Sequence, residues 1–183
     1  MQPLIYLSFF FFISEFVLML WKRSKKSYTK VQKDQGSMLL LWISISACLA
    51  VGLMFSGQQS DQNNPVLIAG IIVFVIGNFL RWISIIQLGS MFTVDVAISK
   101  EHQLKTNGIY GVVRHPSYLG LFLILIGLSL GMNSVFSFLI VVLPNFLSLN
   151  YRIKVEEKAL LIEFSEEYKR YMKSTKKIIP LIY

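Results

Sequence analysis

The apolar residues of the chain are gathered into long blocks with few interruptions. Three blocks occupy residues 3–21, 38–56 and 65–88. A further apolar stretch, residues 118–149, is divided by the short segment 131–134, which leaves room only for a tight hairpin. Because a membrane-spanning helix needs about 17 to 25 predominantly apolar residues, the pattern predicts five spans. The last two are expected to be shorter and coupled in a helical hairpin.

The composition agrees with a membrane protein and excludes several other classes. Of the 183 residues, 54% are apolar and only 15% are charged, whereas soluble globular chains carry about a quarter charged residues. Disordered, collagen-like and ordinary soluble proteins are therefore excluded. We expect an all-α, polytopic membrane protein with one domain, in which residues 1–88 supply three spans and residues 89–183 carry the chemistry.

Basic residues define the expected orientation of the spans. All of them except Arg81 lie after the first apolar block, after the third block, or in the C-terminal tail. Short loops rich in Lys and Arg stay in the cytoplasm, so we expect the N-terminus outside and the C-terminus inside. The first block is expected to be a retained span, because a secretory signal carries its positive charge before the apolar stretch. The net charge of +8 favours anionic lipid headgroups as partners and not nucleic acid.

Cysteine and histidine are too few to predict a disulfide or a metal centre. Cys48 is the single cysteine and lies within the second apolar block, so an intrachain disulfide is excluded. The two histidines, His102 and His115, have no cysteine partners with which to bind zinc, and no metal site is expected.

The polar segment before the fourth span ends in a candidate anion-binding site. Pro116 has no amide hydrogen and disfavours helical geometry at His115, so a helix is expected to begin at or just after it. Arg114 and His115 would then lie at a helix N-terminus, where free amides and the helix dipole favour an anionic group. Alternatively, Arg114 reaches lipid phosphates while Tyr110 and Tyr118 form an interfacial aromatic belt.

Ionisable and polar residues also occur inside two of the apolar blocks. Asn78, Arg81 and Ser84 are spaced three apart and form one polar stripe on a helix. The stripe either lines a passage for a lipophilic substrate entering from the bilayer, or Arg81 extends its charge to the membrane surface. Glu15 in the first block has three open interpretations, namely pairing with Arg81, facing a partner, or lining a groove.

The fourth span and the tail add two further patterns. Small residues at Gly120, Gly127 and Gly131 predict close packing of the fourth helix against the fifth. Arg152 and Glu156 lie four residues apart and project from one helix face where the fifth span leaves the bilayer. Such a pair is either an ordinary salt bridge or, because charges at membrane depth tend to face a cavity or partner, part of a site.

A family resemblance connects these residues. The motifs are Gly108-x-Tyr110-x-x-x-Arg114-His115-Pro116-x-Tyr118-x-Gly120, then Arg152-x-x-x-Glu156-Glu157, then Phe164-x-Glu166-Glu167-Tyr168-x-x-Tyr171, and finally Pro180. Together they resemble the isoprenylcysteine carboxyl methyltransferase family, from about His102 to Pro180. Membrane phospholipid methyltransferases share parts of the pattern. Before His102 the resemblance is only one of topology.

The resemblance implies S-adenosylmethionine as cofactor, in a cytoplasm-facing pocket formed by the last spans and a cytoplasmic C-terminal helix. The cofactor-binding residues that it implies are His102, Gln103, Leu104, Lys105, Tyr110, His115, Pro116, Ser117, Tyr118 and Glu156. Arg152 matches the arginine assigned to the substrate carboxylate. Two positions depart from the family pattern: Lys105 stands where Val is frequent, and Ser165 replaces the usual Gly after Phe164.

The expected function is methyl transfer to the carboxylate of a lipophilic, prenylcysteine-like or isoprenoid substrate. Such a carboxylate is already ionised and needs alignment and loss of water instead of a base. Arg152 and Arg114 are the candidate catalytic residues, and Arg152, Arg81 and Asn78 are the candidate substrate-binding residues. Two alternatives stay open. The first is a phospholipid N-methyltransferase with Glu156 or Glu157 near the amine, and the second is a membrane scaffold without turnover.

Overall fold

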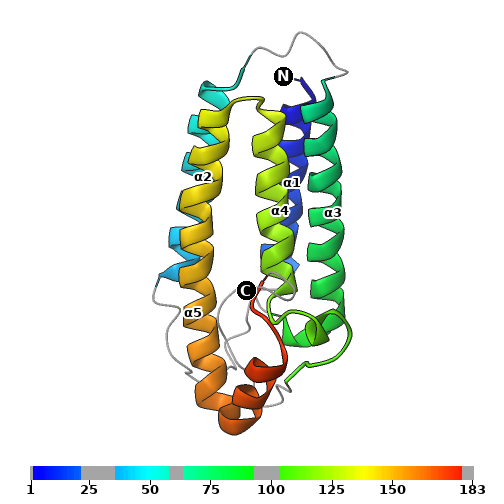
Figure 1. The fold of residues 1–183 in the computed structure, drawn as a ribbon, viewed down its shortest axis with the longest axis vertical. Helices are drawn as coiled ribbons and strands as arrows, with labels where there is room; N and C mark the ends of the chain where they lie inside the picture. Colours follow the sequence, from blue (N-terminus) through cyan, green and yellow to red (C-terminus); the bar gives the residue numbers. More distant parts are fainter. Residues whose placement is uncertain (1, 22–35, 58–63, 93–103, 179–183) are drawn as a thin grey trace.

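The computed structural model of the chain describes residues 2–21, 36–57, 64–92 and 104–178, and within them the fold is helical (Figure 1). The helices are α1 (Gln2–Trp21), α2 (Ser37–Met54), α3 (Pro65–Leu88), α4 (Pro116–Gly131) and α5 (Val135–Ser174), with short 3-10 turns η1 (Gly89–Met91) and η2 (Gly108–Gly111) before α4. The five helices correspond to the five apolar blocks. The predicted all-α architecture is therefore confirmed.

Four of these helices, α1, α2, α3 and α5, are long and apolar enough to cross a bilayer. The 16 residues of α4 extend about 24 Å at helical rise, which is somewhat less than the hydrocarbon core of about 30 Å. Many large apolar side chains point outward, including Tyr6, Phe79 and Leu147, each close to 70% exposed. An apolar surface of this kind suits lipid and not water, and the chain is a multi-pass membrane protein.

Glycines bring α3 and α4 into backbone contact. A Cβ atom added at Gly127 would lie 2.5 Å from the amide nitrogen of Phe74, and one at Gly120 would lie 2.6 Å from that of Arg81. On the facing helix, a Cβ at Gly77 would lie 2.7 Å from the amide nitrogen of Ile124. Without side chains at these positions, the two helices approach closely and gain dispersion contacts. The prediction that the α4 glycines face α5 is wrong, because Gly120 and Gly127 face α3.

A second pair of helices, α2 and α5, lies side by side and antiparallel (Figure 1). At one end, the Ser137 hydroxyl donates to the carbonyl of Gly52 at 2.8 Å. At the other end, Nη1 of Arg152 donates to the Ser37 hydroxyl at 2.8 Å. Between these ends, buried Ile45 and Leu49 belong to the same apolar core as Val141 and Leu149. The first residue of α2 is thereby fixed beside the polar continuation of α5.

The hairpin pattern predicted a short last helix, but α5 is not shorter than the others. It has 40 residues and continues beyond its apolar segment as a polar helix. Ser165 adopts φ 42° and ψ −110°, a non-helical conformation that breaks α5 into two arms. The second arm turns back toward the bundle (Figure 1). This arm is the predicted C-terminal helix, and Ser165 occupies a positive-φ position that suits Gly better than Ser.

Candidate active site

The site is built on the segment that leads from η2 into α4. As predicted, α4 begins at Pro116, and His115 is the residue that precedes its first turn. The segment runs parallel to the chain beyond α5, because Arg114 N–H donates to the carbonyl of Lys176 at 2.8 Å and His115 N–H to that of Lys177 at 3.0 Å. These backbone bonds attach the start of α4 to the C-terminal part of the chain.

A polar network joins this segment to α5 and α2. The Tyr118 hydroxyl donates to Oε2 of Glu156 at 2.7 Å and accepts from Nε of Arg152 at 3.2 Å. Arg152 is 3% exposed and also contacts Ser37 at the start of α2. Arg152 and Glu156 are therefore not merely an exposed helix pair, because the phenol of Tyr118 lies between their charged groups.

Glu157 is the centre of a second, adjacent cluster. Its Oε1 accepts from Nε of Arg114 at 3.0 Å and lies 3.4 Å from Nε2 of His115, while Nζ of Lys177 lies 3.6 Å from Oε2. Burial raises the pKa of Glu157, but the hydrogen bonds and charges of His115 and Arg114 outweigh burial and hold it below its ordinary value. Glu157 is consequently an ionised carboxylate with three basic neighbours.

Arg114 is fully engaged in holding the C-terminal arm. Besides Glu157, its Nη1 donates to the carbonyl of Met172 at 3.2 Å and to that of Thr175. The side chain is 7% exposed. Arg114 thus connects the start of α4 to the last turn of α5, and its predicted catalytic role stays a prediction.

Tyr110 is anchored from two sides. Its hydroxyl donates to the carbonyl of Ser84 on α3 at 3.1 Å, and its carbonyl accepts from the hydroxyl of Tyr171 on α5 at 2.5 Å. Burial, followed by the charge of Glu156, raises the pKa of the Tyr110 phenol well above its ordinary value. The phenol therefore stays protonated and keeps its role as a donor.

The intramembrane pair foreseen as one possibility for Glu15 is present. Nη2 of Arg81 donates to Oε2 of Glu15 at 2.6 Å, and Nε donates to Oε1. Nη1 of the same guanidinium donates to the carbonyl of Ser117 at 3.2 Å. Arg81 is buried, and its guanidinium is directed at Glu15 and at the Ser117 carbonyl.

The structure brings together most of the predicted site residues. Tyr110, His115, Pro116, Ser117, Tyr118, Arg152 and Glu156 lie around the start of α4, whereas His102 and Gln103 lie outside the described residues. Leu104 and Lys105 are half-buried. Asn78 lies one turn before Arg81 on α3, and its amide nitrogen is buried without a hydrogen-bond partner in the described part of the chain. Its predicted contact with substrate stays untested.

Sequence reasoning missed Ser37, Gln87 and the anchoring role of Tyr171. Ser37 follows a basic segment at the start of an apolar block, a position that carries no chemical signal by itself. Gln87 Oε1 accepts from the Ile109 amide at 3.3 Å, and its spacing of three residues after Ser84 extends the polar stripe of α3. That spacing was the signal available for finding it.

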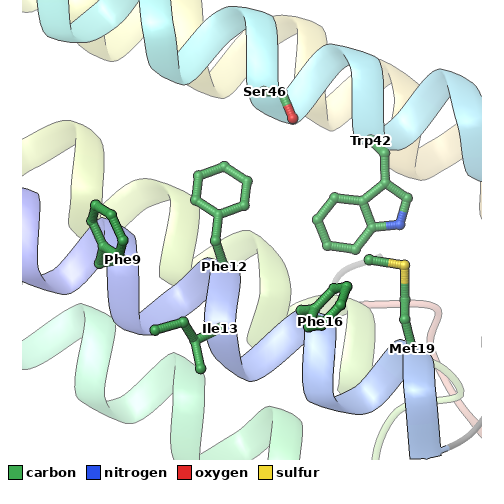
Figure 2. A pocket seen from close by; sticks show the side chains of 7 residues that line it. All are labelled: Phe9, Phe12, Ile13, Phe16, Met19, Trp42 and Ser46. Atoms are coloured by element: carbon green, nitrogen blue, oxygen red, sulfur yellow. The ribbon is translucent and has the colours of Figure 1, made fainter.

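An apolar groove runs along α1 and α2. It has a volume of about 600 Å³ and is lined on α1 by Phe9, Phe12, Ile13, Phe16 and Met19 and on α2 by Trp42 and Ser46. Figure 2 shows Trp42 opposite Met19 and Phe16 at one end of the groove and Ser46 toward the other end. Trp42 lies five residues after Ser37, so this end is the one nearer Arg152.

The middle of the chain, from within α3 to within α5, matches a known family. A model of the isoprenylcysteine carboxyl methyltransferase family matches residues 70–162, which is half of the chain. These residues include α4, the segment before it, and the part of α5 that carries Arg152 and Glu156.

Individual relatives and a solved structure agree with this match. Protein-S-isoprenylcysteine O-methyltransferase from Schizosaccharomyces pombe is 37% identical over 58% of this chain and 46% of the relative. The Saccharomyces cerevisiae enzyme of the same name is 32% identical over 76% of this chain and 61% of the relative. Enzyme B from Arabidopsis thaliana is 28% identical over 94% of this chain and 89% of the relative. The structure of a eukaryotic intramembrane Ras methyltransferase has a TM-score of 0.61 and 27% identity, covering 81% of this chain and 50% of that one.

The extent of these matches defines what they establish. The chain spans about half the length of the two fungal relatives, whereas nearly all of it corresponds to the Arabidopsis protein. The residues that the family model matches include Tyr118, Arg152 and Glu156. The chain belongs to the isoprenylcysteine carboxyl methyltransferase family.

Proposed function

We propose that the protein is a membrane methyltransferase that uses S-adenosylmethionine to methylate the carboxylate of a prenylcysteine-like substrate. The observation that carries the proposal is the Tyr118 hydroxyl between Glu156 and Arg152. It places a carboxylate suited to the cofactor next to a guanidinium suited to an acceptor carboxylate. The named activity of the relatives supports the same assignment.

The residues around the start of α4 suit the chemical groups of the cofactor. Glu156 is an acceptor for ammonium or ribose hydroxyl groups, and the rings of Tyr110 and Tyr118 offer faces for a cation. His115 gives no side-chain cap to the first turn of α4, so the amides of that turn are suited to a carboxylate. The Tyr168 hydroxyl is buried with no hydrogen-bond partner in the described part of the chain, and it is a further polar group that suits a ligand. When bound, the cofactor supplies a methyl group on a sulfonium centre.

Arg152 has the position and chemistry to align an acceptor carboxylate. A guanidinium presents donors in a planar fork that matches a carboxylate with two parallel hydrogen bonds. Because the acceptor carboxylate is already ionised near neutral pH, no general base is required. The remaining tasks of the protein are to hold the carboxylate in line with the methyl group and to remove its water. Arg152 would do the first, and its burial favours the second.

The α1–α2 groove suits the hydrocarbon part of the substrate. Its residues from Phe9 to Met19 span ten positions of α1, or about 15 Å at helical rise, and all but Ser46 of the lining residues are apolar. We expect the hydrocarbon chain to enter sideways from the bilayer, while the water-soluble cofactor enters from the cytoplasm. We expect the start of α4 on the cytoplasmic side, because the tail that contacts it is rich in Lys and Arg.

Methyl transfer to candidate acceptors tests the proposal directly. The full chain in liposomes would be given S-adenosylmethionine with a radiolabelled methyl group and either an S-farnesylated N-acetylcysteine or phosphatidylethanolamine. We expect label in the prenylcysteine as a base-labile ester, loss of transfer in Arg152→Met, and partial loss in Arg152→Lys. Transfer to phosphatidylethanolamine alone would establish the N-methyltransferase alternative, and no transfer to either acceptor with intact cofactor binding would favour the scaffold.

A further inference from the structure

The buried polar stripe of α3 contacts residues 109–117, which lead into α4, at three successive levels. Arg81 donates to the carbonyl of Ser117 at 3.2 Å, the carbonyl of Ser84 accepts from Tyr110, and Oε1 of Gln87 accepts from the amide of Ile109. All three partners lie within residues 109–117, which include the start of α4. The part of the stripe from Arg81 to Gln87 therefore faces residues 109–117.

The Arg81 contact depends on Glu15 of α1. Glu15 occupies Nε and Nη2 of the guanidinium, which leaves Nη1 directed at the Ser117 carbonyl. The side chains of Arg81 and Glu15 are only 9% and 3% exposed, and a buried charge without a partner is strongly unfavourable. Glu15 thus both neutralises Arg81 and fixes the plane in which its third donor points.

The geometry of the helices makes this contact specific to arginine. Gly120, one turn after Ser117, lets α4 approach the backbone of Arg81 so closely that an added Cβ would lie 2.6 Å from the Arg81 amide nitrogen. A guanidinium in this position reaches the carboxylate and the carbonyl at the same time, because its donors are fixed in a fork. A lysine ammonium has the charge but lacks the planar fork.

The Gln87 contact lies at the other end of the stripe, beside a glycine with positive φ. Gly108 has φ 64°, in the left-handed region that favours glycine, and a Cβ there would lie 2.6 Å from Oε1 of Gln87. The side chain of Gln87 therefore packs directly on the turn that precedes Ile109 and Tyr110. Its acceptor oxygen fixes the backbone from which Tyr110 extends toward Ser84.

We propose that Arg81 and Gln87 are positioning residues for the methyl-donor site, with Glu15 holding Arg81 in place. They act through the Ser117 carbonyl and the Ile109 amide, and so set where Tyr110 and Tyr118 present their rings and hydroxyls. This inference rests on the proposed function. It gives the polar stripe of α3 a task other than lining a passage for substrate.

The test measures cofactor affinity and resistance to unfolding in the full chain, purified in detergent. Binding of S-adenosylhomocysteine would be measured by titration calorimetry, and unfolding by the fluorescence of the tryptophans. The test variant is Arg81→Lys. The matched control is Ser14→Ala, which removes the 3.0 Å hydrogen bond from Nε1 of Trp82 to the Ser14 hydroxyl at the same α1–α3 contact without touching Ser117.

For Arg81→Lys we expect a Kd for S-adenosylhomocysteine about tenfold higher than in the wild type, as for the loss of one hydrogen bond to a charged group. Ser14→Ala should lower the unfolding temperature and leave the Kd unchanged. In turnover, Arg81→Lys should raise the KM for S-adenosylmethionine more than it lowers kcat. An unchanged Kd in Arg81→Lys, or an equal rise in Ser14→Ala, would overturn the positioning role of Arg81.

A second pair of variants keeps the inference testable if Arg81→Lys does not fold. Gln87→Met removes the acceptor for the Ile109 amide, and Gln87→Glu retains an oxygen there. The Kd should rise in the first and return toward the wild-type value in the second, and equal Kd values in both would contradict the positioning role. Wild-type protein that fails to bind S-adenosylhomocysteine would overturn the proposed function itself, whereas wild-type binding with unchanged variants would overturn only this inference.

Discussion

Replacing Tyr118 with phenylalanine probes the network between the two proposed binding residues. The change removes one hydroxyl and keeps the ring, whose centroid lies 5.8 Å from that of His115. Glu156 loses a donor at 2.7 Å and Arg152 loses an acceptor at 3.2 Å. Both partners carry charge, and a hydrogen bond to a charged group contributes about 1.5 to 3 kcal/mol.

The free energy of these hydrogen bonds sets the expected loss of cofactor affinity. A loss of about 1.5 kcal/mol in the orientation of Glu156 corresponds to roughly a tenfold weaker affinity. We therefore expect Tyr118→Phe to raise the Kd for S-adenosylhomocysteine about tenfold in a calorimetric titration. Because Arg152 loses its contact as well, the KM for a prenylcysteine acceptor should rise in the same variant.

The control for this prediction is Tyr151→Phe. Tyr151 precedes Arg152 on α5 and is 38% exposed, so the same chemical change there should leave cofactor affinity unaltered. Equal affinities of the wild type and Tyr118→Phe would refute the reasoning, since they would show that Glu156 does not depend on the phenol. An equal loss in Tyr151→Phe would assign the effect to general destabilisation of α5.

Three further predictions concern packing, backbone strain and pH. Gly127→Ala should destabilise the protein by about 3 kcal/mol in thermal unfolding, because the new methyl group meets Phe74 backbone atoms that cannot move singly; an unchanged unfolding temperature would show that α3 and α4 separate freely. Ser165→Gly should stabilise it by about 1 kcal/mol, since φ 42° is strained for serine, and a lower unfolding temperature would contradict this. The pKa of Glu157 is lowered in the folded protein, so its ion pairs stabilise the fold fully above its ordinary value of 4.5 and progressively less as the pH falls below it. The difference in unfolding temperature between wild type and Glu157→Gln should accordingly shrink on acidification, and a difference independent of pH would be evidence against these ion pairs.

Much of the fold was predictable because apolar blocks and breaks are local signals. Pro116 set the start of α4, and segment 131–134 set the hairpin. The extent of α5 was not predictable in this way, since helix propensity continues through the polar residues after Leu149 without a break. Its interruption is at Ser165, where the family pattern has Gly, and a single Ser is only a weak turn signal by itself.

The partners of buried charges were less predictable. Arg81 and Glu15 were each recognisable as unusual inside apolar blocks, yet they lie 66 residues apart, and only the tertiary structure pairs them. The prediction that the α4 glycines form a close-packing surface is confirmed, but the prediction of the helix that they face is wrong. Spacing along one helix reports which residues share a face, whereas the neighbour of that face depends on how the whole bundle assembles.

The site itself was predictable chiefly where motif residues lie close in sequence. His115, Pro116, Ser117 and Tyr118 form one turn, and their proximity needed no fold. Ser37 escaped notice because its contact with Arg152 joins α2 to α5 across the bundle. Residues that support a site from distant helices carry no local signature, and the three-dimensional contacts are needed to find them.

In the proposed function, the start of α4 and Glu156 form a pocket for S-adenosylmethionine. Calorimetric titration of S-adenosylhomocysteine into the purified full chain tests it most directly, with Glu156→Gln and exposed Glu163→Gln as a matched pair. We expect binding by the wild type and by Glu163→Gln, and binding at least tenfold weaker in Glu156→Gln. Absence of binding by folded wild-type protein, or equal affinities in all three, would contradict it.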